Sequence, residues 1–191
     1  MSDPARRRAT YADVLAVAPH QIAEIVNGEL IVSPRPAPRH ARASSILTGK
    51  LMGPFDEGTG GPGGWWILDE PEIHFEPGEP IVPDLAGWKR TRLPALPETA
   101  YFELAPDWVC EVLSPSTAAI DRIEKMPIYA SHGVAHAWLI DPVLQTLEVF
   151  RLEAKSWMLA GTFRAAAKVR AEPFDAIEIE LASLWTPAPA R

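Results

Sequence analysis

Two acidic residues and one lysine are the side chains whose types and spacing first suggest chemistry. Asp84 lies in the apolar run 81–86. Glu111 lies in the apolar run 108–113. A carboxylate inside an apolar run is costly to bury unless a cation meets it. Two such carboxylates on neighbouring strands, followed by Lys125 on a helix-like stretch, describe a site for a divalent metal ion and a phosphate.

The three side chains have complementary tasks in such a site. Mg²⁺ prefers one or two protein carboxylates together with water and phosphate oxygens, and we consider Mn²⁺ as a substitute. We expect Asp84 and Glu111 to bind the metal ion, which neutralises a phosphate and lowers the pKa of an attacking water. We expect Lys125 to stabilise the charge of the phosphate in the transition state or to help activate the water.

The chain between the two acids is long enough to leave one strand, cross a loop and return on a neighbouring strand. If those strands are adjacent, Asp84 and Glu111 lie at the same end of a sheet. The pattern after the second strand predicts a helix over about 116–131, which can bring Lys125 to the same pocket. Pro127 predicts a kink or a break in this helix.

The remaining pattern predicts a sheet with helices around it. Asn27-Gly28 between the apolar-rich runs 23–26 and 29–32 is typical of a β-hairpin. We expect a helix over 39–52 and strands over 65–75, 135–140, 146–152 and 157–163. The predicted fold class is therefore α/β (α+β): a mixed sheet flanked by helices, with an N-terminal hairpin and a C-terminal antiparallel meander.

The composition fits one domain in a reducing compartment. The chain has 191 residues, 47% of them hydrophobic, which is enough to bury a core. Cys110 is the only cysteine, so no intrachain disulfide can form and we expect a cytoplasmic protein. No apolar run approaches the roughly 20 residues of a membrane helix, so we expect no membrane partner. We expect one domain over 10–186, between a flexible N-terminal tail (1–9) and a C-terminal tail (187–191).

The charge balance limits how the protein can bind nucleic acid. The formal net charge of −7 argues against a protein that coats nucleic acid non-specifically. A small basic surface is compatible with this charge, because Arg35, Arg39 and Arg42 surround His40 near the start of a predicted helix. These side chains either contact phosphate at the helix end or form a solvated basic face, and both interpretations stay open.

Several other polar residues have a plain structural interpretation. Glu24 or Glu29 in the hairpin can join the metal site as an outer ligand, although a solvated hairpin acid is the commoner outcome. Asp121 lies four residues before a lysine, and we favour a surface ion pair. His74 is expected on the solvent face of a strand. Cys110 faces away from the acid that follows it, so we expect a buried structural cysteine rather than a nucleophile.

The order of these motifs is similar to that of a known family. The motifs are Pro83-Asp84, then Glu111-Val112-Leu113-Ser114-Pro115-Ser116-Thr117, then Asp121, Lys125, Tyr129, Gly133-Val134 and Trp138-Leu139-Ile140-Asp141-Pro142. The opening Glu24-Ile25-Val26-Asn27-Gly28-Glu29-Leu30, with Pro34, Pro36 and His40, belongs to the same pattern. Over roughly residues 10 to 185 the chain resembles the Uma-type restriction endonuclease family of the PD-(D/E)XK nuclease superfamily.

The resemblance implies a restriction-endonuclease-like fold and a Mg²⁺-dependent endonuclease that hydrolyses DNA phosphodiester bonds. It implies that Asp84 and Glu111 are the metal-binding acids. The usual lysine of the superfamily lies two residues after the second acid, where this chain has Leu113. The resemblance implies that Lys125, from the following helix, replaces that lysine.

Two other functions stay open at this point. A module that keeps the nuclease fold and binds nucleic acid or a protein without useful turnover is favoured by Leu113, Pro127 and the net charge of −7. A metal-dependent hydrolase with a different substrate needs a pocket that the sequence does not reveal. By analogy with enzymes that cut both strands of DNA, we expect a homodimer.

Overall fold

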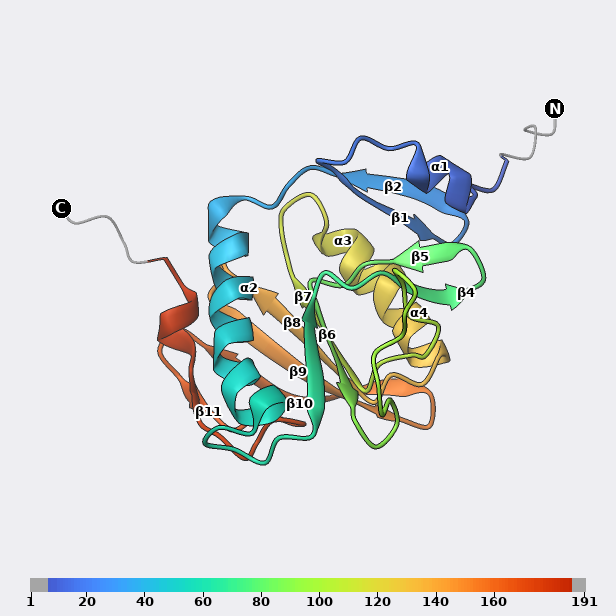
Figure 1. The fold of residues 1–191 in the computed structure, drawn as a ribbon. Helices are drawn as coiled ribbons and strands as arrows, with labels where there is room; N and C mark the ends of the chain where they lie inside the picture. Colours follow the sequence, from blue (N-terminus) through green and yellow to red (C-terminus); the bar gives the residue numbers. More distant parts are fainter. Residues whose placement is uncertain (1–6, 187–191) are drawn as a thin grey trace.

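A six-stranded sheet forms the centre of the computed structural model, which describes residues 7–186 (Figure 1). The strand order is β10-β9-β8-β7-β6-β3. The strands are β3 (Trp65–Asp69), β6 (Leu85–Lys89), β7 (Trp108–Val112), β8 (His136–Asp141), β9 (Thr146–Glu153) and β10 (Ser156–Arg164). The pair β7 and β8 is parallel and the other neighbours are antiparallel, so the sheet is mixed. The predicted α/β (α+β) class is confirmed.

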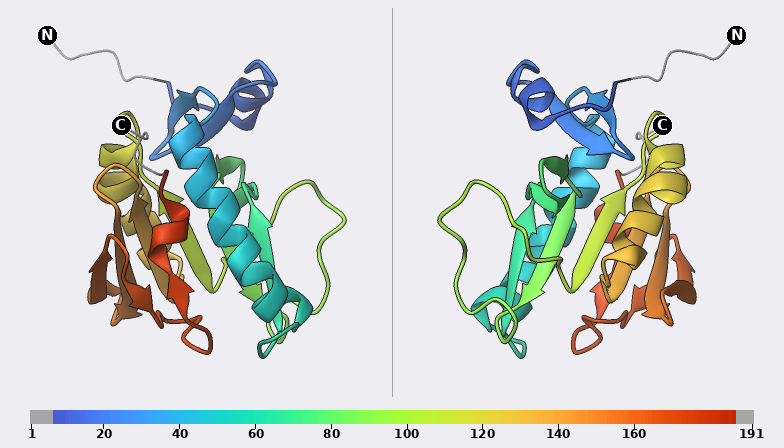
Figure 2. Two further views of the ribbon diagram at one scale, coloured as in Figure 1. Left: turned by 90° about the vertical axis from the view of Figure 1, so that its left-hand side faces the viewer. Right: turned by 90° about the vertical axis from the view of Figure 1, so that its right-hand side faces the viewer.

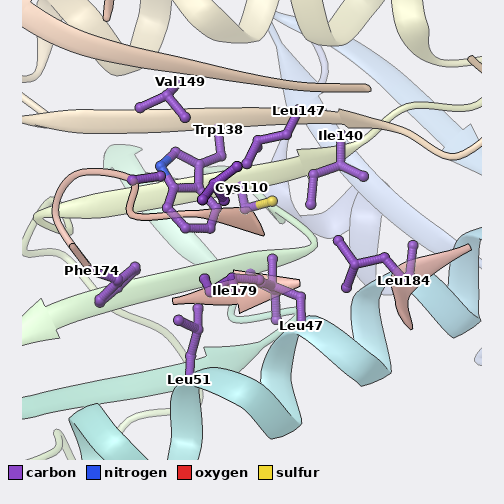
Figure 3. Packing of buried hydrophobic residues seen from close by; sticks show 14 of the residues in the cluster. Leu47, Leu51, Cys110, Trp138, Ile140, Leu147, Val149, Phe174, Ile179 and Leu184 are labelled. Atoms are coloured by element: carbon purple, nitrogen blue, oxygen red, sulfur yellow. The ribbon is translucent and has the colours of Figure 1, made fainter. Parts of the chain in front are cut away.

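The two faces of the sheet are covered by different segments because successive side chains of a strand point to opposite faces. On one face, Cys110 and Trp138 pack against helix α2 (Pro38–Leu51) and the C-terminal segment (Figure 3). The helix contributes the buried residues Ala43, Leu47 and Leu51, at the spacing expected from the sequence. After α2, a π-helical turn (η1, Met52–Glu57) leads into a glycine-rich loop at 58–64.

A helical segment after β7 covers the opposite face and leads to the parallel strand β8. It consists of α3 (Ala118–Ile120), a π-helical turn (η2, Asp121–Lys125) and α4 (Met126–Ser131). The predicted helix over 116–131 is therefore interrupted, and the interruption begins before Pro127. Pro127 lies in the first turn of α4, where its missing N–H is tolerated.

The smaller elements surround the main sheet. The predicted hairpin is confirmed as β1 (Ile22–Val26) and β2 (Glu29–Ser33). Together with α1 (Tyr11–Leu15) it lies at one end of the main sheet (Figures 1 and 2). The other small elements are the pair β4 (Ile73–Glu76) and β5 (Glu79–Ile81), the pair β11 (Lys168–Val169) and β12 (Ile179–Glu180), and a 3₁₀ turn (Leu181–Leu184). The predicted C-terminal meander is confirmed as β9 and β10.

Two predicted strands are divided in the structure. The segment 65–75 forms β3 and β4, which belong to different sheets, because the chain bends at Glu70, whose φ is 45°. The run 81–86 is divided between β5 and β6, so Asp84 lies in a short break immediately before β6 rather than inside a strand. Pro83 lacks the N–H that a continuous ladder needs. This break lets the Asp84 side chain leave the sheet.

His74 differs from the expectation of a solvent-facing residue. It is buried, and its ring stacks on Tyr101 at 4.0 Å between ring centroids. Its Nε2 lies 2.7 Å from Glu72 Oε1, which also accepts a hydrogen bond from Tyr11. This cluster joins α1, β4 and the loop after β6. The polar side chains on this face of the strand therefore contact α1 and a loop rather than solvent.

Residues 8 and 9, which we expected in a flexible N-terminal tail, contact the rest of the protein. The Ala9 N–H donates to the Gly28 carbonyl at 2.8 Å, and Arg8 pairs with Glu79 at 2.6 Å. The division into 1–9, 10–186 and 187–191 stays a prediction, and 1–6 and 187–191 lie outside the described residues. Within 7–186, no helix has the length and apolar character needed to cross a membrane.

Candidate active site

A pocket of about 270 Å³ opens where the hairpin, the start of α2 and the ends of β6 and β7 meet. Its walls are the connector between β2 and α2 and the turn between β7 and α3. The titratable side chains in its lining include Glu24, His40, Asp84, Glu111, Asp121 and Lys125. The pocket therefore brings together the predicted catalytic triad and two of the predicted outer residues.

The two predicted metal ligands meet because their strands are neighbours. Strands β6 and β7 pair antiparallel with Leu85 opposite Cys110, which places Asp84 beside Glu111. The Val112 N–H donates to Asp84 Oδ2 at 2.7 Å, and the Asp84 N–H lies 3.4 Å from Glu111 Oε2. Backbone amides thus orient both carboxylates toward the same end of the sheet.

Lys125 reaches the same place from the π-helical turn on the helical segment. Its Nζ lies 2.9 Å from Glu111 Oε1 and 2.9 Å from Glu24 Oε1. Only 3% of the Lys125 side chain is exposed, so solvent screens these ion pairs little. Glu24 is therefore part of the site, whereas Glu29 is exposed and does not line the pocket.

Tyr129 and Asp121 complete the polar cluster and were not predicted as site residues. The Tyr129 hydroxyl, buried on α4, donates a hydrogen bond to Glu111 Oε1. The predicted ion pair between Asp121 and Lys125 is present at 3.9 Å, but its expected place on the surface is wrong, because both residues are buried. The spacing of four residues between 121, 125 and 129 was the available signal, since it places all three side chains on one helical face.

The side chains of the predicted basic segment lie in different places in the structure. His40 Nε2 lies 3.2 Å from Asp84 Oδ1, so His40 belongs to the pocket. Arg39 is exposed and lines an adjoining hollow that also includes His40. Arg42 instead donates to the backbone carbonyls of Ser183 and Trp185, which fastens α2 to the C-terminal segment.

The crowding of carboxylates around one ammonium changes the protonation of the site. Burial raises the pKa of Glu111 well above its usual value, and the Lys125 charge opposes this shift. Burial likewise raises the pKa of Asp121 to about 6, again against the effect of Lys125. Burial lowers the pKa of Lys125, but Glu111 and Glu24 more than offset this, so its pKa is well above the usual value. Lys125 is therefore a permanent cation at neutral pH.

His40 is the second basic group of the pocket that faces a carboxylate. Burial lowers the pKa of its imidazole, but the Asp84 carboxylate opposes this effect and the net shift is upward. Four carboxyl groups thus face one ammonium and one imidazole. Such a gathering of oxygen acceptors suits the binding of a further cation.

The carboxylates match a divalent metal ion in type and in available oxygens. Within 7–186, no group of three or more His, Cys, Asp and Glu side chains forms a ready metal cluster. Mg²⁺, however, needs only one or two carboxylates beside water and phosphate. The tighter contacts are made by Asp84 Oδ2 and Glu111 Oε1. Asp84 Oδ1 and Glu111 Oε2 have contacts of 3.2 and 3.4 Å, so they are the oxygens best placed to hold a metal ion.

The two neighbours of Glu111 that bear on the chemistry are buried. Leu113, two residues after Glu111, packs with Met126 and Tyr129 of the helical segment and is 2% exposed. Cys110 is confirmed as a buried structural cysteine, and burial raises the pKa of its thiol well above the usual value. Neither side chain lines the pocket.

A comparison with known families decides the identity of the chain. Residues 9–182 match the model of the Uma2 family, whose description is "Putative restriction endonuclease". The chain belongs to the Uma2 family. The match spans every pocket residue named above, confirms the resemblance seen in the sequence, and supports nuclease activity in general terms.

A solved structure shares the fold of this Uma2 protein. It is described as a putative nuclease belonging to DUF820 from Anabaena variabilis, with a TM-score of 0.74 and 22% sequence identity. The similarity covers 92% of this chain and 97% of that chain, which confirms the restriction-endonuclease-like fold. No curated protein matches the chain.

Proposed function

We propose that this Uma2 protein is a Mg²⁺-dependent endonuclease that hydrolyses DNA phosphodiester bonds. The observation that carries the proposal is the meeting of Asp84 and Glu111, each with one loosely held carboxylate oxygen, in a pocket that holds two further carboxyl groups. Mn²⁺ can take the place of Mg²⁺, because both accept carboxylate oxygens.

Each residue of the pocket has a task in this proposal. Asp84 and Glu111 hold the metal ion, which when bound neutralises the phosphate and lowers the pKa of the attacking water. Lys125 supplies a fixed positive charge beside Glu111. His40, in the pocket, and Arg39, on the adjoining surface, contact the phosphate backbone of the DNA.

Metal binding and DNA cleavage test the proposal together. Titration calorimetry with Mn²⁺ should show one site in the wild type, and Asp84→Ala and Glu111→Ala should each weaken binding at least tenfold. In Mg²⁺, plasmid nicking should be lost in both variants and in Lys125→Ala. Glu124→Gln is a matched control, because Glu124 lies next to Lys125 but contacts Asn27 instead of the pocket. Equal metal binding by Asp84→Ala and the wild type would contradict the assignment.

A second function has its own supporting observations. Leu113 is buried where the usual lysine would lie, and Lys125 is occupied by protein carboxylates. Both favour a nuclease-fold module that binds nucleic acid or a protein partner without useful turnover. Mn²⁺ binding without cleavage of supercoiled, linear or single-stranded DNA would favour this module over the nuclease.

A homodimer stays part of the proposal on the analogy with enzymes that cut both strands of a duplex. Sedimentation velocity at micromolar concentration distinguishes a dimer from the monomer of 20.9 kDa. A monomer with nicking activity on one strand would remove the dimer and leave the nuclease proposal intact.

A further inference from the structure

The Lys125 ammonium has a full set of protein acceptors. An ammonium carries three N–H donors. Its Nζ lies 2.9 Å from Glu24 Oε1, 2.9 Å from Glu111 Oε1 and 3.3 Å from the Val82 carbonyl oxygen. These three acceptors account for all three donors, and the side chain is 3% exposed. Direct contact with a substrate phosphate would therefore require one of these bonds to break.

The same oxygen of Glu24 that contacts Lys125 also accepts a hydrogen bond from the backbone. The Val82 N–H donates to Glu24 Oε1 at 2.7 Å. Val82 lies two residues before Asp84, in the break between β5 and β6. One carboxylate from the hairpin thus contacts both the cation that holds Glu111 and the backbone that carries Asp84.

The two carboxylate oxygens of Glu111 have different contacts. Oε1 receives both Lys125 and the Tyr129 hydroxyl, while Oε2 has only the longer contact with the Asp84 N–H at 3.4 Å. Holding Oε1 from two sides fixes the rotamer of Glu111 and leaves Oε2 turned toward Asp84. Such support by neighbouring residues sets how well a carboxylate binds a metal ion.

We propose that Glu24 is a positioning residue: from the N-terminal hairpin, it holds Lys125 against Glu111 and the Val82 backbone beside it, and so orients both metal-binding carboxylates. In this role Glu24 acts through Lys125 and the Val82 backbone rather than as an outer metal ligand, and Lys125 acts through Glu111 rather than on the phosphate. The inference rests on the proposed metal-dependent function, and it assigns a role in catalysis to the hairpin, which belongs to a separate small sheet.

The first test follows the Lys125 ammonium in the metal-free protein. Nuclear magnetic resonance of the ¹⁵N-labelled side chain measures the exchange of its protons with water, and Lys125→Met assigns the signal. We expect slow exchange in the wild type and exchange at least tenfold faster in Glu24→Ala. Glu24→Gln keeps an acceptor oxygen and should show an intermediate rate. Unchanged exchange in Glu24→Ala would overturn the proposal.

The second test is Mn²⁺ affinity by calorimetry. We expect the dissociation constant to rise at least fivefold in Glu24→Ala and less in Glu24→Gln. Glu29→Gln, which removes the same charge from the exposed part of the hairpin, should stay within twofold of the wild type. Faster exchange with unchanged Mn²⁺ affinity would also overturn the positioning of the metal carboxylates.

Failure of the proposed function gives a different result. A wild type that binds no Mn²⁺ would refute the metal site, and the exchange measurement alone would then decide whether Glu24 holds Lys125. Thermal unfolding followed by circular dichroism identifies a variant that has lost its fold, and Glu24→Gln then serves in place of Glu24→Ala.

Discussion

At the scale of single residues, the site is a cluster of buried groups whose hydrogen bonds and charges depend on one another. Glu111 illustrates this, because its Oε1 accepts from a phenol and from an ammonium that come from different turns of the helical segment. Removing one of these side chains leaves the remaining buried polar groups with fewer hydrogen-bond partners. Single substitutions here should therefore have larger effects than substitutions on the surface.

Tyr129→Phe tests the hydrogen bond to Glu111. The substitution keeps the buried ring but removes a donor to a buried carboxylate. We expect the free energy of unfolding in urea to fall by about 1–3 kcal/mol. Tyr101→Phe is the control, since it keeps the ring that stacks on His74 outside the pocket. Equal stability of Tyr129→Phe and the wild type would show that this bond does not stabilise the fold.

Asp121→Asn tests the crowding of negative charge. The pKa of Asp121 in the folded protein, about 6, lies above the ordinary value of 3.8, mainly because the carboxylate is buried. The neutral form is therefore favoured by folding, so this stabilising contribution is present below pH 4 and is lost as the pH rises through 6. Asp121→Asn, which is always neutral, should be more stable than the wild type by about 2–3 kcal/mol at pH 7.5.

The stability of Asp121→Asn and of the wild type should also be compared near pH 4. There the two proteins should have nearly equal free energies of unfolding in urea, because Asp121 is then protonated in the folded protein. Asp175→Asn, at an exposed aspartate, should show no such dependence on pH. A constant difference between Asp121→Asn and the wild type from pH 4 to 7.5 would contradict the assigned shift.

At the scale of elements, the turns decide whether side chains from distant segments meet. The π-helical turn Asp121–Lys125 brings Lys125 to the ends of β6 and β7, and the hairpin β1–β2 brings Glu24 to the same ammonium. The hairpin depends on its two-residue turn, in which Asn27 and Gly28 have φ values of 52° and 80°. Both lie in the left-handed region that glycine adopts most readily.

Gly28→Ala tests this turn. A side chain at φ 80° is strained, and its Cβ would approach the Arg8 side chain to 2.8 Å. We expect the free energy of unfolding to fall by about 1 kcal/mol, measured in urea. Gly49→Ala is the matched control, because Gly49 lies in α2 with no atom within 4 Å of an added Cβ. It should stabilise the protein by about 0.5–1 kcal/mol. A similar loss at both positions would contradict the role given to the turn.

At the scale of the whole molecule, a bound metal ion should stabilise the fold, because its proposed ligands, Asp84 and Glu111, come from distant segments that meet only in the folded chain. Mn²⁺ at about 100 times its dissociation constant should add about 2.7 kcal/mol to the free energy of unfolding. For a chain of this size, this corresponds to a rise in Tm of about 5–10 °C. Thermal unfolding by circular dichroism measures it, and the rise should be absent in Asp84→Asn. An equal rise in both proteins would indicate binding elsewhere.

Much of the fold was predictable from local patterns. The spacing of Ala43, Leu47 and Leu51 predicted a helix with one buried face, and Asn27-Gly28 predicted the hairpin. The break at Asp84 was not predicted, although Pro83 pointed to it. The π-helical turn was not predicted either, because no local pattern distinguishes it from an α-helical turn. His74 looked like a surface residue, since its cover comes from Tyr101 on a distant loop.

The sequence by itself determined which groups are available: Asp84 and Glu111 within apolar runs, a lysine after them, and motifs that identify the family. Only the tertiary structure decided which of these groups meet and how they are charged. Lys125 pairs with Glu24 across 101 residues of chain because the hairpin covers the end of the main sheet, and burial then raises the pKa values of Glu111 and Asp121. Such contacts and such desolvation depend on packing in space, which no spacing along the chain records.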